Sequence, residues 1–550
     1  MKKTILILLI NLPLLAFSQG ISSAQQHKLQ SVLMAISNMY VDSIDDKKVI
    51  ENTIVSMLRE LDPHSAYIPV EEVQRVQEPL KGSFEGIGVQ FQMLEDTLLV
   101  VQTIAGCPAE KVGILPGDRM IYIENELIAG VKMQNTQIME RLRGKKGTEV
   151  NVKILRRGQK ELLSFKIIRD KIPVYTVDAS YMAGKDIGYI RINNFGATTI
   201  DEYKKAFNGL SELGMKHLIL NLQGNGGGRL DIAIELSDQF LSAGELIVFT
   251  EGLRQRRQEA VATQRGNYEK GKLIVLVDEY SASASEITAG AVQDWDRGII
   301  VGRRTFGKGL VQRELPLEDG SLIRLTTARY YTPTGRSIQK PYKDGVKKYE
   351  EDLMSRFKHG ELMHADSIHF PDSLKYETRR LGRTVYGGGG IMPDVFIPLD
   401  TTKYTDYHRW LVARGVMNKT SVQYIESHRE ELKSLYPTFE AFKENYAVSD
   451  DFIALLFENG KKERQSNNKE EVEDLEIETE LKPQAGEKGL SDEEQMVKSK
   501  ELIKLQLKAL IARDIWDTNE YYRIIDEENE SLKRAIEILQ TKGEYERMFK

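Results

Sequence analysis

The sequence has 550 residues, of which 41% are hydrophobic and 29% are charged; a chain of this length predicts two to four domains rather than one core. The net charge of −6, with both signs mixed along the chain, excludes the basic footprint of a nucleic-acid-binding protein. The lone cysteine, Cys107, excludes an internal disulfide, and no Cys/His cluster has zinc-ligand spacing. We therefore expect no metal site, no other cofactor and no nucleic-acid partner.

Residues 1–18 have the pattern of a cleaved signal peptide. Lys2 and Lys3 precede an apolar run, and Ala16-Phe17-Ser18 places small residues at the positions that signal peptidase reads. The alternative is a short membrane anchor, but about 20 apolar residues are needed to span a bilayer and this run is shorter. We expect an exported, periplasmic protein that begins near Gln19.

Residues 22–78 have helical periodicity, interrupted at Asp62-Pro63. Apolar side chains recur at helix spacing in this segment: Val32, Leu33, Ile36, Tyr40, Ile50, Ile54, Met57 and Leu58. A segment of this size is too small to bury such a stripe alone. We expect it to pack on a neighbouring domain or on a second subunit.

Residues 80–170 change to short alternating strands separated by turns. A Gly86-Ile87-Gly88-Val89 loop opens the region, Pro116-Gly117-Asp118 precedes another strand, and a helix near 136–143 and a strand over 149–156 follow. This order resembles a PDZ domain. The resemblance predicts that the backbone N–H groups of the loop, at Gly86, Ile87, Gly88 and Val89, hold a peptide C-terminal carboxylate. The alternative is that the two glycines only form a turn.

Residues 172–400 alternate strand and helix, which is typical of α/β organisation. Strands are predicted over 187–194, 217–222 and 272–277, and helices over 199–213, 231–241 and 283–294. In such folds the functional groups lie at the turns from strand to helix.

The C-terminal part divides into a helical region over 402–462, an acidic stretch and a second helical segment over 492–550. Residues 470–480 contain seven acidic residues and no basic one, so 464–491 is predicted to be a flexible acidic linker. Helical periodicity over 492–541 again gives an apolar stripe.

The first candidate for chemistry is the turn that ends in Ser283. Small residues follow a predicted strand there and open a helix. A serine at a helix start lies in positive potential, beside N–H groups that can stabilise an oxyanion. The alternative is simple N-capping, for which serine is a favoured residue.

The second candidate is Lys308, which lies between two glycines. To act as a general base it must be neutral near pH 7, and burial favours the neutral form. Gln312, four residues on, is placed to orient the amine. The alternative is a surface lysine in a hairpin. Gly302–Lys308 also matches most of a nucleotide-binding loop, but Gly309 replaces the required Ser or Thr, so we reject that function.

Together the two turns resemble the signature of the C-terminal processing, or tail-specific, peptidases. Ser281–Asp294 reads S-A-S-A-S-E-I-T-A-G-A-V-Q-D and Thr305–Gln312 reads T-F-G-K-G-L-V-Q. Further family motifs are present at Leu61–Ile68, Tyr331–Gln339 and Gly388–Val395. The resemblance implies a multidomain α/β fold, with a β-barrel-like PDZ domain inserted before a crotonase/ClpP-like protease core and helical segments at both ends.

The resemblance also implies roles for individual residues. Ser283 is the expected nucleophile, Lys308 the general base and Gln312 its support. The implied backbone donors to the oxyanion are Ala284 and either Gly227 or Gly228. Two departures from the family pattern stand out: the strand before the Gly-rich turn ends Asn221-Leu222-Gln223-Gly224 instead of D-L-R-x, and residues 341–386 form an insertion of unknown role.

The function implied is that of a serine endopeptidase acting on exported proteins with apolar C-terminal tails. An adaptor lipoprotein is a candidate partner. A homodimer is expected, with residues 22–78 or 492–541 at the interface; the alternative is that these stripes dock on the chain's own core. The alternative function is that of a catalytically weak PDZ scaffold that binds peptides. Loss of Ser283 or Lys308 would have favoured this alternative, but the sequence contains both residues.

Overall fold

The computed structural model describes residues 20–467 and 490–549. Contacts divide the chain into two compact units, Met1–Leu61 and Asp62–Lys550. The predicted signal peptide, and most of the predicted acidic linker, lie outside the described residues. In the part of the chain that the structure covers, no helix combines the length and the apolar character required to cross a bilayer.

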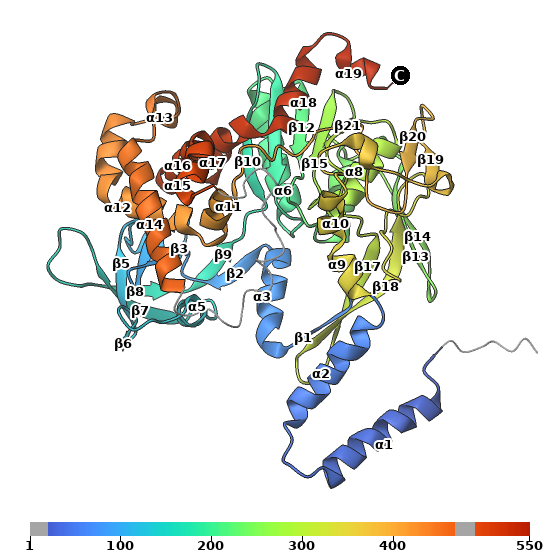
Figure 1. The fold of residues 1–550 in the computed structure, drawn as a ribbon, viewed down its shortest axis with the longest axis horizontal. Helices are drawn as coiled ribbons and strands as arrows, with labels where there is room; N and C mark the ends of the chain where they lie inside the picture. The colour runs from blue at the N-terminus through green and yellow to red at the C-terminus, as the bar shows by residue number, and fades with distance from the viewer. Residues whose placement is uncertain (1–19, 468–489, 550) are drawn as a thin grey trace, which may run out of the picture. The chain divides into compact units, whose positions relative to one another are not determined.

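The first unit consists of helices α1 (Ser23–Met39) and α2 (Asp46–Arg59) (Figure 1). Both begin at a side-chain cap, because the side chains of Ser22 and Asp45 accept backbone N–H groups of the first turn. Within the unit the predicted apolar stripe is left largely exposed; the large apolar side chains open to solvent include Leu29, Val32, Met34, Met39, Tyr40, Val41, Ile50 and Met57.

The rest of the predicted N-terminal helical segment belongs to the second unit. Strand β1 (Ala66–Ile68) pairs antiparallel with β18 (Leu322–Tyr331), and helix α3 (Val70–Lys81) follows it. The Asp62 carboxylate accepts the N–H groups of His64 and Ser65 and the Ser65 hydroxyl, so the turn before β1 is locked. The segment that contains β1 and α3, unlike α1 and α2, is therefore part of the second unit and of its α/β core.

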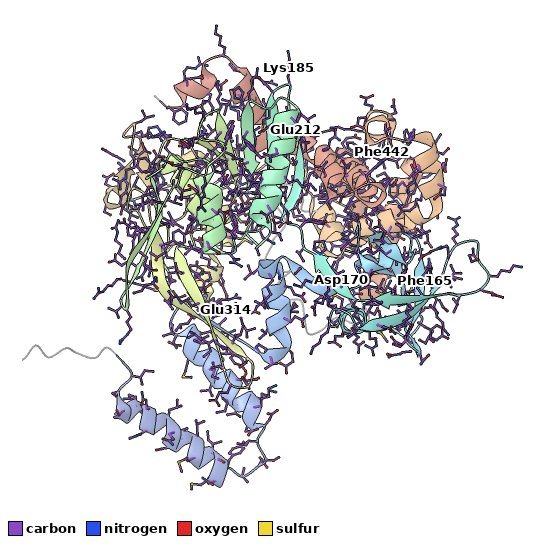
Figure 2. The ribbon with its side chains drawn as sticks, turned by 180° about the vertical axis from the view of Figure 1, so that it is seen from behind. Phe165, Asp170, Lys185, Glu212, Glu314 and Phe442 are labelled. Carbon is purple, nitrogen blue, oxygen red and sulfur yellow. The ribbon has the colours of Figure 1, made fainter. Side chains whose placement is uncertain are left out.

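The PDZ region is a sheet in the order β3-β4-β5-β7-β8, with β6 at the side of β5 and a separate β2-β9 ladder. Figure 2 labels Phe165 on β8, against the core of this sheet. The element bounds are β2 (Ser83–Gly86), β3 (Val89–Leu94), β4 (Thr97–Thr103), α4 (Pro108–Lys111), β5 (Arg119–Ile123), β6 (Glu126–Leu127), α5 (Asn135–Leu142), β7 (Glu149–Leu155), β8 (Leu163–Ile168) and β9 (Asp170–Pro173).

The α/β core is built on a sheet in the order β10-β11-β12-β15-β16-β21. Its strands run parallel from β11 onward, while β10 pairs antiparallel at the edge. The bounds are β10 (Val177–Met182), β11 (Ile187–Ile192), α6 (Thr199–Glu212), β12 (His217–Asn221), α7 (Leu230–Asp238), β15 (Leu273–Val277), α8 (Ala284–Asp294), β16 (Ile299–Gly302) and β21 (Val395–Phe396). Helices α6, α7 and α8 bury their apolar side chains with one face of this sheet.

An antiparallel sheet completes the core, in the order β1-β18-β13-β14 with β17 also paired to β18. Its further strands are β13 (Leu246–Gly252), β14 (Gln255–Val261) and β17 (Leu310–Pro316). The insertion over residues 341–386 contains α9 (Val346–Glu350), α10 (Asp352–Lys358), two short 3-10 turns (Ala365–Ser367 and Asp372–Leu374), and the hairpin of β19 (Lys375–Glu377) and β20 (Thr384–Tyr386).

The C-terminal helices pack in two places. A cluster with its own core contains α11 (Asp406–Ala413), α12 (Val416–Leu435), α13 (Phe439–Asn445), α14 (Asp450–Asn467), α15 (Asp492–Lys498), α16 (Lys500–Ile515) and α17 (Thr518–Ile525). Helix α12 also contacts the PDZ sheet, where Glu426 holds Arg119 at 3.0 Å. Helices α18 (Glu530–Gln540) and α19 (Glu544–Arg547) cover the second face of the parallel sheet.

The apolar stripe predicted over 492–541 is therefore buried within its own chain. Leu532, Ile538 and Leu539 pack against sheet residues such as Ile219 and Ile274. This is the alternative that the sequence left open, docking on the chain's own core, and it removes the physical reason for placing this segment at a subunit interface.

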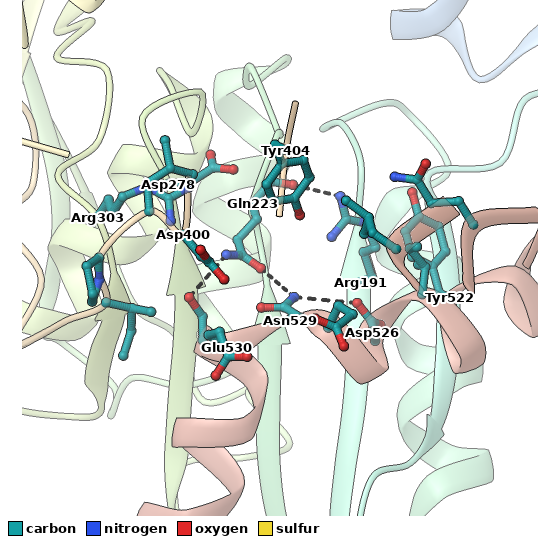
Figure 3. A pocket seen from close by; sticks show the side chains of 18 of the residues that line it. Arg191, Gln223, Asp278, Arg303, Asp400, Tyr404, Tyr522, Asp526, Asn529 and Glu530 are labelled. Atoms are coloured by element: carbon teal, nitrogen blue, oxygen red, sulfur yellow. Dashed lines mark hydrogen bonds between the residues drawn. The ribbon is translucent and has the colours of Figure 1, made fainter. Parts of the chain in front are cut away.

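A polar cavity of about 420 Å³ lies where the C-terminal helices α16, α17 and α18 meet the carboxyl ends of the parallel strands (Figure 3). Asn529 donates a hydrogen bond to Gln223 at 2.8 Å, and Arg191 donates to the Gln223 carbonyl at 2.9 Å. Gln223 and Asn221 are the residues that depart from the family pattern. The Gln223 side chain meets the docked C-terminal helices at Asn529 and Ser531, whereas the Asn221 amide donates to the Tyr189 hydroxyl at 2.7 Å.

Candidate active site

Ser283 ends the turn that follows β15 and is the N-cap of α8. Its backbone has φ +55° and ψ −111°, a left-handed conformation that costs a non-glycine residue energy. Such strain persists only where the surroundings hold it, and it occurs preferentially at functional sites. The turn thus presents the serine side chain at the start of a buried helix.

Lys308 lies in the loop between β16 and β17. The backbone N–H and C=O groups from Thr305 to Lys308 all have hydrogen-bond partners elsewhere in the fold. The N–H groups donate to the carbonyls of Ile391 and Ser281 and to the Glu286 carboxylate. The C=O groups accept from the Arg356 guanidinium, the Lys340 N–H and the Tyr330 hydroxyl. A loop held at each peptide group fixes the point from which the lysine side chain extends.

Glu286 joins the serine turn to the lysine loop. One carboxylate oxygen accepts the N–H groups of Ser283 at 2.9 Å and Lys308 at 2.8 Å. The other accepts the Gly307 N–H at 2.7 Å and the Thr305 hydroxyl at 2.6 Å. Burial raises the pKa of Glu286, and these donors oppose that rise by stabilising the charged form.

Tyr330 joins the same two residues through their carbonyls. Its buried hydroxyl lies 3.1 Å from the Ser283 carbonyl oxygen and 2.7 Å from that of Lys308, and donates to them. Burial raises the pKa of Tyr330 well above its ordinary value, so the hydroxyl keeps its proton at any working pH. The backbones of Ser283 and Lys308 are thus tied at both their N–H and C=O groups.

Ser283 and Lys308 line one cavity of about 420 Å³. Its walls include apolar side chains from α3, α7, α8 and β17: Val76, Pro79, Leu80, Leu230, Ile287, Leu310 and Val311. The ion pair of Glu314 and Arg324, at 2.9 Å, lies at the same cavity; Glu314 is labelled on β17 in Figure 2. An apolar cavity beside a serine and a lysine suits small or apolar side chains of a bound peptide.

Burial lowers the pKa of Lys308 below its ordinary value, and the charge of Arg324 lowers it further. Glu286 and Asp62 act in the opposite direction. Burial and the nearby Lys308 also lower the pKa of His64 to about 4, so this imidazole is neutral at neutral pH. The site therefore favours a neutral lysine, which is the form that accepts a proton.

Gln312 lines the same cavity, but its amide donates to the His64 carbonyl at 2.6 Å. The sequence assigned it to the lysine amine. In the structure it instead fastens the Asp62–Ser65 turn to β17, and His64 in turn contacts the Tyr349 hydroxyl at 2.7 Å. The support of Lys308 by Gln312 stays a prediction.

The Gly-rich turn lies against the serine backbone. A Cβ added at Gly227 would lie 2.8 Å from the Ser283 Cβ and 3.0 Å from the Ala284 nitrogen. The Gly227 N–H donates to the Asn225 side chain at 2.8 Å, whereas Gly228 and Ala284 both line the cavity. Of the two glycines that the sequence left open, Gly228 lines the cavity, and the Gly227 N–H already has an acceptor in Asn225.

The predicted carboxylate loop of the PDZ region is covered in this conformation. Gly86, Ile87 and Gly88 are buried, and Val89 is half-buried. A Cβ at Gly88 would lie 2.4 Å from the Cys107 Cβ, and φ there is +79°, so packing alone requires a glycine. The role of this loop in carboxylate binding stays a prediction.

Sequence reasoning missed Glu286 and Tyr330. A signal for Glu286 was present, because Ser-x-x-Glu at a helix start is the capping-box pattern, in which the glutamate returns to the N-cap N–H. That pattern does not reveal that the same carboxylate also binds the Lys308 loop. Tyr330 belongs to a strand distant in sequence, and no local pattern marks its role.

Comparison with known proteins agrees with this arrangement. Residues 186–348 match the model of peptidase family S41, residues 86–167 match the PDZ domain, and residues 407–487 and 476–517 match a family of unknown function. The chain is 38% identical over 320 residues to a carboxy-terminal-processing protease of Bartonella bacilliformis, covering 57% of this chain and 73% of the relative.

Two further similarities are weaker. The chain is 36% identical over 318 residues to the carboxy-terminal processing protease CtpB of Bacillus subtilis, covering 57% of this chain and 65% of the relative. The solved structure of a photosystem II D1 C-terminal processing protease is 26% identical, with a TM-score of 0.34, over 58% of this chain and 91% of that one. A score this low supports no inference about geometry.

Proposed function

This chain belongs to the family of carboxy-terminal processing proteases in peptidase family S41, and we propose that it is a serine endopeptidase with a Ser283–Lys308 catalytic pair. Its proposed substrates are exported proteins recognised through apolar C-terminal tails. The observation that carries the proposal is that Ser283 and the pKa-lowered Lys308 line one apolar cavity, with their backbones tied together by Glu286 and Tyr330.

In the proposed reaction the Ser283 hydroxyl attacks the peptide carbonyl carbon and its proton passes to the neutral Lys308 amine. The Ala284 and Gly228 N–H groups bind the resulting oxyanion. Lys308 then returns the proton to the leaving amine as the peptide bond breaks, which leaves an ester on Ser283. A water molecule attacks this ester and Lys308 accepts the water's proton. As the bond to Ser283 breaks, Lys308 returns that proton to the Ser283 oxygen, which releases the carboxylic acid product and restores both the serine hydroxyl and the neutral amine.

Incubation of purified protein with unfolded substrates that end in apolar residues tests the proposal. Cleavage products should appear with the wild-type protein and be absent with Ser283→Ala. Ser211→Ala, which changes an exposed serine on α6, serves as the control and should keep full activity. Equal inertness of wild type and Ser283→Ala would favour a peptide-binding scaffold.

We propose that the PDZ domain reads the substrate's terminal carboxylate through the loop Gly86–Val89, and we expect amidation of that carboxylate to weaken binding or activation. The physical reason is that an amide lacks the charge that backbone N–H donors stabilise. Matched peptides with free-acid and amidated C-termini, titrated against Ser283→Ala by calorimetry, measure the difference. Equal affinities would show that the loop is only a turn.

We propose that the protein is exported to the periplasm and that an adaptor lipoprotein is a candidate partner. We also propose that two copies form a homodimer through the first unit. The support for the dimer is the exposed apolar stripe of α1, which has no buried residue within the unit. Light scattering of the mature protein at micromolar concentration should give a dimer, and removal of residues 20–61 should give a monomer.

A point substitution on α1 sharpens this test. Val32→Glu should dissociate the dimer, because it places a charge in the apolar stripe, whereas Gln30→Glu adds the same charge at an exposed polar position and should leave the dimer intact. A full-length monomer, or a dimer that survives both the truncation and Val32→Glu, contradicts the proposal.

A further inference from the structure

The insertion over residues 341–386 contacts the Lys308 loop directly. The guanidinium of Arg356, on α10, donates to the Thr305 carbonyl at 2.8 Å and to the Phe306 carbonyl at 3.0 Å. Arg356 is almost completely buried, with 2% of its surface exposed. A planar guanidinium presents parallel donors, so it fixes both carbonyls relative to each other.

A buried charge network holds Arg356 in place. The Asp352 carboxylate lies 2.9 Å from the Arg356 Nε and 3.0 Å from the Lys340 ammonium. Lys340 lies over the rings of Phe306 and Tyr349, at 4.0 and 4.1 Å from their centroids, and its backbone N–H donates to the Gly307 carbonyl at 2.9 Å. The carbonyls of residues 305, 306 and 307 are thus held by α10 and by the residue that precedes the insertion.

The insertion also contacts His64 and Arg304. Tyr349, on α9, contacts the His64 ring nitrogen at 2.7 Å, and Glu361 pairs with Arg304 at the start of the loop. His64 lies close enough to Lys308 for the lysine charge to lower the pKa of its imidazole. The insertion therefore touches the loop that carries the lysine and the turn that packs beside it.

From these contacts we infer that the insertion is a built-in part of the active site, in which Arg356 acts as a positioning residue that fixes the Lys308 loop through the Thr305 and Phe306 carbonyls. The inference rests on the proposed role of Lys308 as general base. Removing Arg356 should loosen the loop, admit water around Lys308 and return its pKa toward the ordinary value of a lysine.

The groups that set this pKa are known from the structure. Arg324 on β18 and the neutral His64 beside β1 face Lys308, as do Glu286 on α8 and Asp62 before β1. Arg356 itself lies near Arg304, Asp352, Glu361 and Glu286. Removal of the Arg356 charge alone would also raise the pKa of Lys308, so the experiment must separate charge from position.

Competitive labelling of Lys308 with trace acetic anhydride, read by mass spectrometry in the Ser283→Ala background, measures its pKa without turnover. Arg356→Met should raise this pKa and, in the Ser283 protein, lower kcat/KM about 100-fold with little change in KM. Arg356→Lys keeps the charge but not the planar fork, and should raise the pKa by a smaller amount. Asp352→Asn should act in the same direction as Arg356→Met.

Arg379→Met is the matched control. Arg379 lies in the same insertion and donates to the Pro333 carbonyl, not to the Lys308 loop, so the pKa of Lys308 should not change. A wild-type pKa and pH profile in folded Arg356→Met, or a shift in Arg356→Met that is absent in Arg356→Lys, would overturn the inference. If Arg356→Met does not fold, Arg356→Lys and Asp352→Asn carry the same test, and wild-type behaviour in both overturns it. The labelling needs no turnover, so its result is independent of the proposed function. Cleavage that survives loss of Lys308 would refute the proposed function and would leave the labelling result as it is.

Discussion

Lys308→Arg is expected to lower kcat/KM by about 10²- to 10⁴-fold, the contribution of a general base. Arginine stays charged at any working pH and cannot accept the Ser283 proton. In the wild-type protein activity should rise with pH through the lowered pKa of Lys308, because the lysine is neutral only above that pKa. A pH series of kcat/KM for the two proteins measures both effects.

Lys308→Met separates catalysis from folding. The pKa of Lys308 is lower in the folded chain than its ordinary 10.5, so the unfolded chain binds the proton more tightly between those two values. Wild-type stability therefore rises with pH across that window, and below it the wild type carries the cost of the buried charge. Lys308→Met should be inactive yet at least as stable as wild type at neutral pH. Exposed Lys348→Arg, on α9, should keep full activity; substantial activity in Lys308→Arg removes the lysine from the mechanism.

Glu286→Gln is expected to lower the free energy of unfolding by about 1–3 kcal/mol and kcat/KM by about 100-fold. An amide has one accepting oxygen, so its NH₂ group must face donors that the carboxylate now accepts. The arrangement that costs least turns NH₂ toward Thr305 and Gly307, which leaves the Gly307 N–H without its acceptor. Chemical denaturation and steady-state kinetics on the same preparation give both quantities.

Glu286→Ala extends this prediction. It leaves the N–H groups of Ser283, Gly307 and Lys308 without their acceptor, and should cost more stability than Glu286→Gln. Tyr330→Phe removes the hydroxyl that binds the Ser283 and Lys308 carbonyls. It therefore compares the contribution of the carbonyl contacts with that of the N–H contacts to Glu286. Wild-type kinetics in a folded Glu286→Gln protein would show that the carboxylate does not position the pair.

Much of the core was predictable because its signals are local. The strand over 217–222 and the helix over 199–213 appear as β12 and α6 within a residue or two, since apolar periodicity and turn residues mark both ends. Ser283 and Lys308 were singled out by the resemblance of their two motifs to the family signature, because the residues of each turn taken alone also fitted an N-cap and a surface lysine. The PDZ region followed from several elements in a fixed order, and its match over residues 86–167 agrees.

What could not be predicted depends on contacts between distant segments. Arg356 binds carbonyls about 50 positions earlier, and Tyr330 spans from β18 to two loops. The apolar stripe over 492–541 gave no indication whether it would meet another subunit or the chain's own sheet, because both bury the same side chains. Gln312 was assigned from its spacing and from the family motif, neither of which shows that its amide donates to the His64 carbonyl, 248 positions earlier in the chain.

The most direct test of the account is covalent labelling of the protein by a fluorophosphonate, with the modified residue located by mass spectrometry across a pH series. We expect the adduct on Ser283, a labelling rate that rises with pH as Lys308 loses its proton, and no measurable labelling in Lys308→Met. Modification of a different residue, or a rate on Ser283 that is independent of pH and unchanged in Lys308→Met, would contradict a Ser283–Lys308 pair.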